Sequence, residues 1–210
     1  MRKSDYILLE GRSHKSYEYP DTLVAKHRLG YAPWVKEVSA DIMGLKLKNT
    51  AKEKCGHAYM GGIIWRDSLR LALLLDHFIV NIRQGVDLKL LLDSKKVFDG
   101  NGKKLNPLEI EAINEEIFGL RAPWRGEHLD ATFYNGKISY DHHLNKYLEL
   151  IPGRAEDLKM GVAEDCKIDL LSCNEQGLPT KEGNDINYWY PRDSAVARFI
   201  AYRCCCGVRC

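Results

Sequence analysis

Four of the seven cysteines in this chain of 210 residues lie within its last seven positions, in the sequence CCCGVRC. Clustered thiols can bind a metal ion, form disulfides or supply a nucleophile. Structural zinc sites usually combine two closely spaced ligand pairs. Cys206 and Cys210, with three residues between them, form one such pair, and no second clean pair exists here. Cys204 and Cys205 are neighbours, so a strand would point them to opposite faces, and a disulfide between them would need strained geometry. The spacing therefore favours neither a zinc site nor a disulfide.

A nucleophilic cysteine would also need a base and an orienting group within reach. The segment DHH at 141–143 could ligate a metal or supply the base, although such pairs more often face solvent. The charged side chains of WRGEHLDA at 124–131 are expected to form local salt bridges and turn caps. The chain contains no glycine-rich phosphate loop and no HExxH or GxSxG motif. These motifs therefore identify no catalytic centre, and we expect no cofactor and no metal.

The composition limits the partners further. The chain has 31 basic and 29 acidic side chains, and this balance gives no electrostatic case for nucleic-acid binding. Its richest apolar stretch, 69–82, is interrupted by charged residues, so we expect no membrane span. The start lacks the apolar core of a secretory signal. We expect a single domain over 1–210 with reduced thiols, cytoplasmic as synthesised, or associated with a virion or a surface by a route that the sequence does not show.

The first half of the chain is expected to be mainly helical. The longest apolar helix, expected over about 64–84, should end at Gly85. Its apolar surface is broad enough for the helix to be buried on most sides. Periodicity and turn residues predict a strand at 6–10, irregular structure over 11–34, and helices at about 34–54, 64–84 and 87–93.

The second half contains clearer local signals. Asn106 can cap a helix over 107–118, because Pro107 suits the first helical position and Glu109 has the capping-box spacing. Asn135-Gly136 suits the tight turn of a β-hairpin. Helices followed by hairpins indicate the α+β class. The sequence also predicts strands at 166–171, 186–191 and 195–209, and a loop at 174–185.

The C-terminal segment NYWYPRDSAVARFIAYRCCCGVRC, 187–210, resembles the end of variable proteins made by diversity-generating retroelements. The similarity includes an aromatic strand at 188–190, the VARF stretch at 196–199 and the final GVR at 207–209. The resemblance implies a C-type-lectin-like fold of the formylglycine-generating-enzyme type, with N-terminal helices and C-terminal short antiparallel strands. The segments 10–24, 97–105, 122–133 and 176–184 are similar to a group of these proteins in archaea, their viruses and little-studied bacteria.

In that family a reverse transcriptase miscopies adenines, so asparagine codons become other codons that end in a pyrimidine. Such codons never specify Lys, Glu, Gln, Met or Trp, and residues 193–210 contain none of these five types. The clustered cysteines would then be one outcome of diversification, with Trp189, Tyr190 and Phe199 as core beneath them. The resemblance implies a variable region at about 188–210 whose ligand-binding residues are Ser194, Ile200, Tyr202, Arg203, Cys204, Cys205 and Cys206.

The resemblance implies a receptor-type protein, not an enzyme, that binds a protein or cell-surface ligand through these variable residues. Two alternatives stay open. One is a cysteine oxidase of the formylglycine-generating type that uses Cys204–Cys206 and Cys210. The other is a structural or metal-binding protein of a mobile element.

Overall fold

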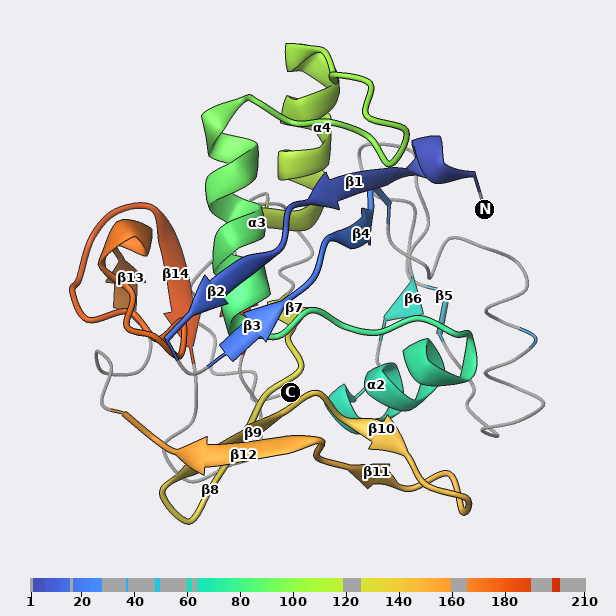
Figure 1. Ribbon diagram of the computed structural model, residues 1–210, viewed down its shortest axis with the longest axis vertical. Helices are drawn as coiled ribbons and strands as arrows, with labels where there is room; N and C mark the ends of the chain where they lie inside the picture. Colours follow the sequence, from blue (N-terminus) through green and yellow to red (C-terminus); the bar gives the residue numbers. More distant parts are fainter. Residues whose placement is uncertain are drawn as a thin grey trace.

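The computed structural model describes residues 2–15, 17–27, 37, 48–49, 60–61, 64–118, 126–159, 166–189 and 198–200. These residues form three α-helices and several small antiparallel sheets (Figure 1), which confirms the α+β class. The expected order of helices first and strands last is wrong. Six strands precede the first of the three helices, and the helices occupy the middle of the described chain.

The N-terminal part forms short antiparallel pairs. The prediction of a strand at 6–10 is confirmed, but that of irregular structure from residue 11 is wrong as far as residue 27. The missed signal is the alternation at 17–19, where both tyrosines are buried and Glu18 is exposed. The pairs are β1 (Tyr6–Leu9) with β4 (Thr22–Ala25), β2 (Arg12–His14) with β3 (Tyr17–Tyr19), and β5 (Lys48–Asn49) with β6 (Met60–Gly61), after the short helix η1 (Lys3–Asp5).

The helix expected at 34–54 lies mostly outside the described residues. Glu37 is helical, but β5 shows that the helix does not continue to residue 54. The single helix expected over 64–84 is also wrong, because α2 (Trp65–Leu74) ends and α3 (Ile82–Ser94) begins as a separate helix.

A capping pair that the sequence interpretation overlooked explains where α3 begins. The Asn81 side chain accepts a hydrogen bond from the Gln84 backbone N–H at 3.1 Å. The Gln84 side chain accepts one from the Asn81 N–H at 3.0 Å. Gly85 consequently lies within the first turns of α3 rather than ending a helix, and the short helix predicted at 87–93 is part of α3.

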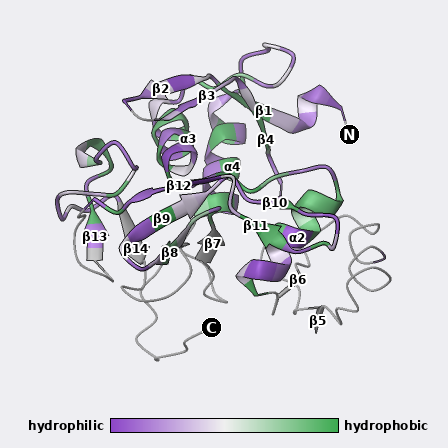
Figure 2. Cartoon of the chain, turned by 60° about the horizontal axis from the view of Figure 1, so that its bottom comes forward, coloured by the Kyte–Doolittle hydropathy of each residue, from purple (hydrophilic) through white to green (hydrophobic). Residues whose placement is uncertain are grey.

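The helix α4 (Pro107–Phe118) has the predicted bounds. The Asn106 side chain accepts a hydrogen bond from the Glu109 N–H at 2.9 Å, so the predicted cap is confirmed. Buried Ile110 and Ile113 face the core, where α4 packs against α3 and α3 against β1. One hydrophobic cluster joins these helices to β1 and β3 and to the second half of the chain, where it includes Phe133, Ile138 and Ile168. Figure 2 shows apolar segments of the helices on the inside of this arrangement.

Two larger sheets follow. The first has the order β12-β9-β8, and Asn135 and Gly136 form its predicted hairpin turn with φ angles of 50° and 69°. The second has the order β13-β14-β15-β7. The strands are β7 (Gly126–His128), β8 (Thr132–Tyr134), β9 (Lys137–Tyr140), β10 (His143–Leu144), β11 (Leu150–Ile151), β12 (Arg154–Asp157), β13 (Cys166–Ile168), β14 (Ile186–Trp189) and β15 (Arg198–Ile200), with the short helix η3 (Leu170–Ser172) after β13.

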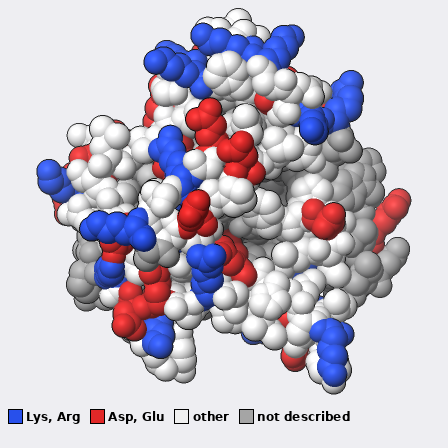
Figure 3. All heavy atoms as spheres, in the orientation of Figure 1, with Lys and Arg blue, Asp and Glu red and all other residues white. Residues whose placement is uncertain are grey.

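These strands confirm the predicted ones in part. The strand expected at 166–171 ends at Ile168 and is replaced by η3. The strands expected at 186–191 and 195–209 are described only as β14 and β15, and the loop at 174–185 is present. Acidic and basic side chains are intermixed over the face in Figure 3, as the balanced composition suggests. Within the described part of the chain, no helix is long and apolar enough to cross a membrane.

Candidate functional site

The predicted ligand-binding residues lie at the end of the chain, where the structure describes only one of them. Ile200 is the last residue of β15, and its neighbours across the sheet are Asn187 in β14 and Gly126 in β7. The other six, Ser194, Tyr202, Arg203, Cys204, Cys205 and Cys206, lie outside the described residues. The strand that leads into the tail is therefore an interior strand, paired on both sides.

The pairing register shows at which end of the sheet β15 terminates. Strands β13 and β15 both run antiparallel to β14, so their last residues lie at the same end of the sheet, where β14 begins. Ile168, the last residue of β13, lies opposite Ile186, and Asn187 lies opposite Ile200. Ile168 and Ile200 therefore lie at the same end of the sheet, and η3 follows shortly after Ile168.

The loop 169–185 is held in place by its own polar side chains. The two carboxylate oxygens of Asp169 accept from the Leu171 N–H at 3.0 Å and from the Ser172 hydroxyl at 2.8 Å. Asp185 accepts from the Leu170 N–H at 3.0 Å. A Cβ added to Gly183 would lie 2.5 Å from the Asp169 nitrogen, so the two arms of the loop pack in direct contact. These contacts fix the conformation of the loop that follows β13.

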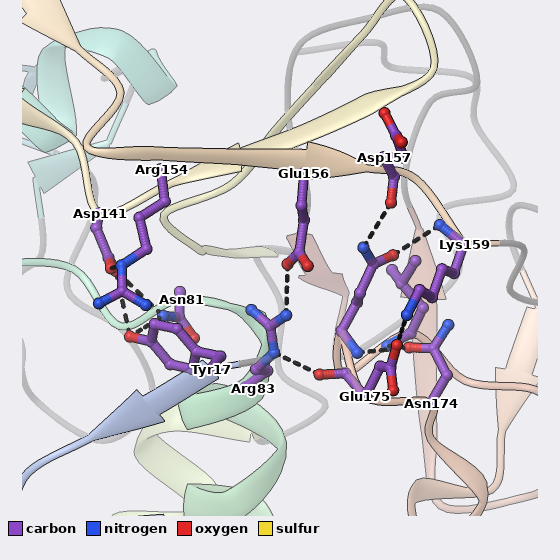
Figure 4. A network of polar contacts seen from close by, with 12 residues as sticks. Tyr17, Asn81, Arg83, Asp141, Arg154, Glu156, Asp157, Lys159, Asn174 and Glu175 are labelled. Atoms are coloured by element: carbon purple, nitrogen blue, oxygen red, sulfur yellow. Dashed lines mark hydrogen bonds and ion pairs between the residues drawn. The ribbon is translucent and has the colours of Figure 1, made fainter. Parts of the chain in front are cut away.

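A buried arginine connects this loop to the core. Arg83 in α3 is 2% exposed, and its guanidinium carbon lies 4.7 Å and 4.9 Å from the ring centres of Tyr17 and Tyr140. Its Nη2 donates to Glu156 Oε1 and its Nε to the Glu175 carbonyl oxygen, both at 2.5 Å (Figure 4). Stacking and charge-assisted hydrogen bonds of this kind suit a buried guanidinium. Arg83 thus joins α3, β12 and the loop.

The network continues on both sides of Arg83 (Figure 4). Buried Gln176 donates to the Asp157 carbonyl at 2.8 Å and accepts from the Lys159 N–H at 2.7 Å. On the other side, the Tyr17 hydroxyl donates to Asp141 at 3.2 Å and accepts from the Asn81 amide at 2.7 Å. These bonds join segments that are distant in sequence, and those of Gln176 hold the loop against residues 157–159.

The ion pair of Arg83 predicts how stability depends on pH. Burial alone would raise the pKa of Glu156, but hydrogen bonds from Arg83 and Tyr140 and the charge of Arg83 hold that pKa below its ordinary value. The ionised carboxylate is therefore favoured in the folded state, and its stabilising contribution is present above the ordinary pKa. That contribution is lost as the pH falls through the lowered folded pKa.

Replacement of Glu156 by Gln removes this proton-linked contribution. We expect the variant to lose less stability than the parent protein when the pH falls from neutral into the acidic range. Urea unfolding at a series of pH values measures the difference. Glu18→Gln is the control, because Glu18 is exposed in β3. Parallel stability profiles for the parent and the Glu156→Gln variant would contradict the assignment.

A second buried carboxylate fastens the β2–β3 hairpin to α3. Asp87, whose side chain is 4% exposed, accepts from the Tyr19 hydroxyl at 2.5 Å and from Arg12 at 3.0 Å, and lies 2.9 Å from His14 Nε2. Burial, followed by the hydrogen bond to Asp87, raises the pKa of Tyr19. Three partners thus occupy the carboxylate, which makes Asp87 a structural anchor for the hairpin.

The segment DHH has mainly structural contacts. Asp141 bonds to Tyr17, and His142 is buried with its Nδ1 2.5 Å from Asp130 Oδ1 and its ring edge against Trp65. His143 is exposed in β10. Asp130 also accepts from the His142 N–H at 2.9 Å, so this residue of 124–131 bonds to a segment twelve residues away rather than forming the local salt bridge or turn cap expected for it.

Cys173 is the cysteine whose side chain the structure describes, and it is not a reactive thiol. Burial raises the pKa of the Cys173 thiol to about 12, so this thiol stays protonated at neutral pH. Cys166 lies in β13 opposite Tyr188. Cys55, Cys204, Cys205, Cys206 and Cys210 lie outside the described residues. Among the residues that the structure does describe, no group of three His, Cys, Asp or Glu side chains could hold a metal ion.

Comparison with family models, with curated proteins and with solved structures finds no match for this chain.

Proposed function

We propose that the chain is a ligand-binding, receptor-type variable protein diversified by a retroelement, with a C-type-lectin-like fold. It binds a protein or cell-surface ligand through Ser194, Ile200, Tyr202, Arg203 and Cys204–Cys206. The proposal rests on the family resemblance of 187–210 and on the absence of Lys, Glu, Gln, Met and Trp from 193–210.

The structural observation that carries the proposal is the interior position of β15. Its three residues pair with β14 on one side and with β7 on the other. A binding surface that varies in sequence needs a scaffold whose stability does not depend on the varying side chains. A strand held by main-chain hydrogen bonds on both sides supplies such a scaffold, because these bonds do not depend on side-chain type.

The chemistry of the tail suits recognition of a protein surface. Tyrosine and arginine are frequent anchors of protein interfaces, and the proposed set contains Tyr202 and Arg203. The cysteines then need no shared role as ligands of an ion or as a catalytic pair. They are residues that a diversified codon can encode.

The DNA that surrounds the gene tests this proposal. We expect a near-repeat of the 3′ end that differs from the gene only at adenines of the repeat, together with a reverse-transcriptase gene nearby. A neighbourhood that lacks both the repeat and the reverse transcriptase would contradict diversification. Stoichiometric zinc in the purified, reduced protein would support the metal-binding alternative instead.

A further inference from the structure

We propose that the connection between α3 and α4 is a docking surface for an anionic lipid bilayer. The surface consists of the basic hairpin, residues 95–105, together with the N-terminal residues that pack against it and Leu23 of β4. This inference goes beyond the proposed function and does not involve the tail. Every residue that supports it belongs to the described part of the chain.

The basic hairpin has a fixed conformation. The Leu105 N–H donates to the Val97 carbonyl at 2.9 Å, and the Asp99 N–H donates to the Lys103 carbonyl at 2.8 Å. The buried carboxylate of Asp99 accepts from the N–H groups of Asn101 at 2.8 Å and Lys103 at 3.0 Å. The main chain and an inward-facing carboxylate therefore hold the hairpin, and its outward side chains contribute little to this support.

Basic side chains gather on this part of the molecule. Four exposed lysines belong to the hairpin: Lys95, Lys96, Lys103 and Lys104. A Cβ added to Gly100 would lie 2.5 Å from the Lys3 carbonyl oxygen, so the start of the chain packs on the hairpin and adds exposed Arg2 and Lys3. Figure 3 shows basic side chains along the upper rim of the molecule, over this connection. The chain as a whole carries a net charge of only +2, so the charge is concentrated locally.

The neighbouring acidic side chains offset this charge only in part. They are Asp5, Asp93, Asp99 and Glu109. Asp93 and Glu109 form ion pairs with two other lysines, Lys89 and Lys26, whose side chains are almost buried. Asp5 lies 3.7 Å from the Arg2 guanidinium, and Asp99 faces into the hairpin. These two carboxylates leave most of the six basic charges uncompensated.

Exposed apolar side chains lie among the lysines. Phe98 is 40% exposed and faces Lys104 across the hairpin as a bridge partner. Leu23 is 39% exposed, and its Cδ2 lies 3.1 Å from the position of a Cβ on Gly100, so it borders the same hairpin. Basic side chains attract anionic headgroups, and apolar side chains between them enter the boundary of the acyl chains. The combination therefore suits a peripheral contact with a bilayer.

The same features favour a bilayer over a nucleic acid. Proteins that bind single strands stack successive bases on several aromatic side chains. The basic hairpin contains one aromatic residue, Phe98, and the apolar side chain beside it is the aliphatic Leu23. Lysine is a compact charge on a flexible stem, which suits attraction to many headgroups without fixed geometry.

Cosedimentation of the full chain with lipid vesicles tests the proposal. We expect binding to phosphatidylcholine vesicles that contain about 30% phosphatidylglycerol, and much weaker binding to pure phosphatidylcholine vesicles. A variant with all four hairpin lysines changed to Gln should bind the anionic vesicles about a hundredfold more weakly, because each lysine contributes about fivefold. Failure of the parent protein to bind the anionic vesicles would overturn the proposal.

The matched control removes the same charge from four exposed lysines on other elements: Lys137, Lys146, Lys167 and Lys181. We expect this fourfold Gln variant to bind the anionic vesicles within about threefold of the parent protein, since these lysines lie outside the proposed surface. All eight lysines are exposed, so both variants should unfold at the temperature of the parent. Equal losses of vesicle binding in the two variants would show that overall charge, not the hairpin, is responsible.

Replacement of Phe98 by Ser separates insertion into a bilayer from attraction of charge alone. We expect it to weaken vesicle binding about fivefold or more, whereas Tyr134→Ser, at a side chain that is 74% exposed in β8, should leave binding unchanged. Unchanged binding of the Phe98→Ser variant would contradict insertion. Tighter binding of the parent protein to oligothymidylate or to polyglutamate than to the anionic vesicles would overturn the choice of a bilayer as the partner.

Discussion

Replacement of Arg83 by Met is expected to lower the free energy of unfolding by about 3–5 kcal/mol. The guanidinium is almost fully buried, and its loss leaves Glu156 without its ion-pair partner and the Glu175 carbonyl without its donor. Methionine fills part of the space between the rings of Tyr17 and Tyr140, so the loss reports mainly the polar contacts. Urea unfolding monitored by circular dichroism measures the change.

Arg154→Met is the matched control. Arg154 also lies over the Tyr17 ring, with its guanidinium carbon 5.1 Å from the ring centre, but its side chain is 51% exposed. Its ion pair with Asp141 is therefore screened by water, and we expect a loss below about 1 kcal/mol. Equal losses for Arg83→Met and Arg154→Met would show that burial of the Arg83 network does not determine its contribution.

Replacement of Gly177 by Ala is expected to destabilise the protein by about 3 kcal/mol. Gly177 has a φ angle of +77°, where an L-residue is strained by roughly 1–2 kcal/mol. A Cβ at this position would also lie 2.9 Å from Ile82 Cγ2 and 3.0 Å from the Arg83 nitrogen. This overlap adds about 1–3 kcal/mol, because α3 and the loop must separate to accommodate the methyl group.

Gly136→Ala separates the two contributions. Gly136 has a similar φ angle of +69°, but a Cβ there would meet no atom within 4 Å. We expect this variant to lose only the backbone term, about 1–2 kcal/mol. Thermal and urea unfolding of both variants measure the difference. A loss for Gly136→Ala as large as that for Gly177→Ala would contradict close packing of the loop on α3.

The elements that could be predicted from the sequence are those defined by neighbouring residues. The bounds of α4 follow from Asn106 and Pro107, and the β8–β9 hairpin follows from Asn135-Gly136. The capping hydrogen bond of α4 joins residues three apart, and the positive φ angles of the hairpin turn belong to two neighbouring residues. The Asn81–Gln84 cap is equally local and could have been found from its spacing.

The polar networks could not be predicted, because their partners are far apart in the chain. Arg83 bonds to the backbone of Glu175, and Tyr19 bonds to Asp87. No periodicity in the sequence relates such positions. The arrangement of the sheet around β15 could not be predicted either. That β13 and β15 terminate at the same end depends on the register of three strands. The sequence indicated which tail residues to consider, but not that β15, which leads to them, ends at the same end of the sheet as β13.

The central claim is that the tail is a replaceable surface on a fixed sheet. Thermal unfolding of a variant with all seven proposed residues changed to Asn tests it most directly: Ser194, Ile200, Tyr202, Arg203, Cys204, Cys205 and Cys206. The control is Phe199→Pro, which disrupts the hydrogen-bonded pairing of β15 inside the sheet and should lower the Tm by about 10 °C. We predict that the sevenfold variant unfolds within a few degrees of the parent protein. A sevenfold variant that unfolds as early as the Phe199→Pro variant would contradict the claim, because these side chains would then be part of the core.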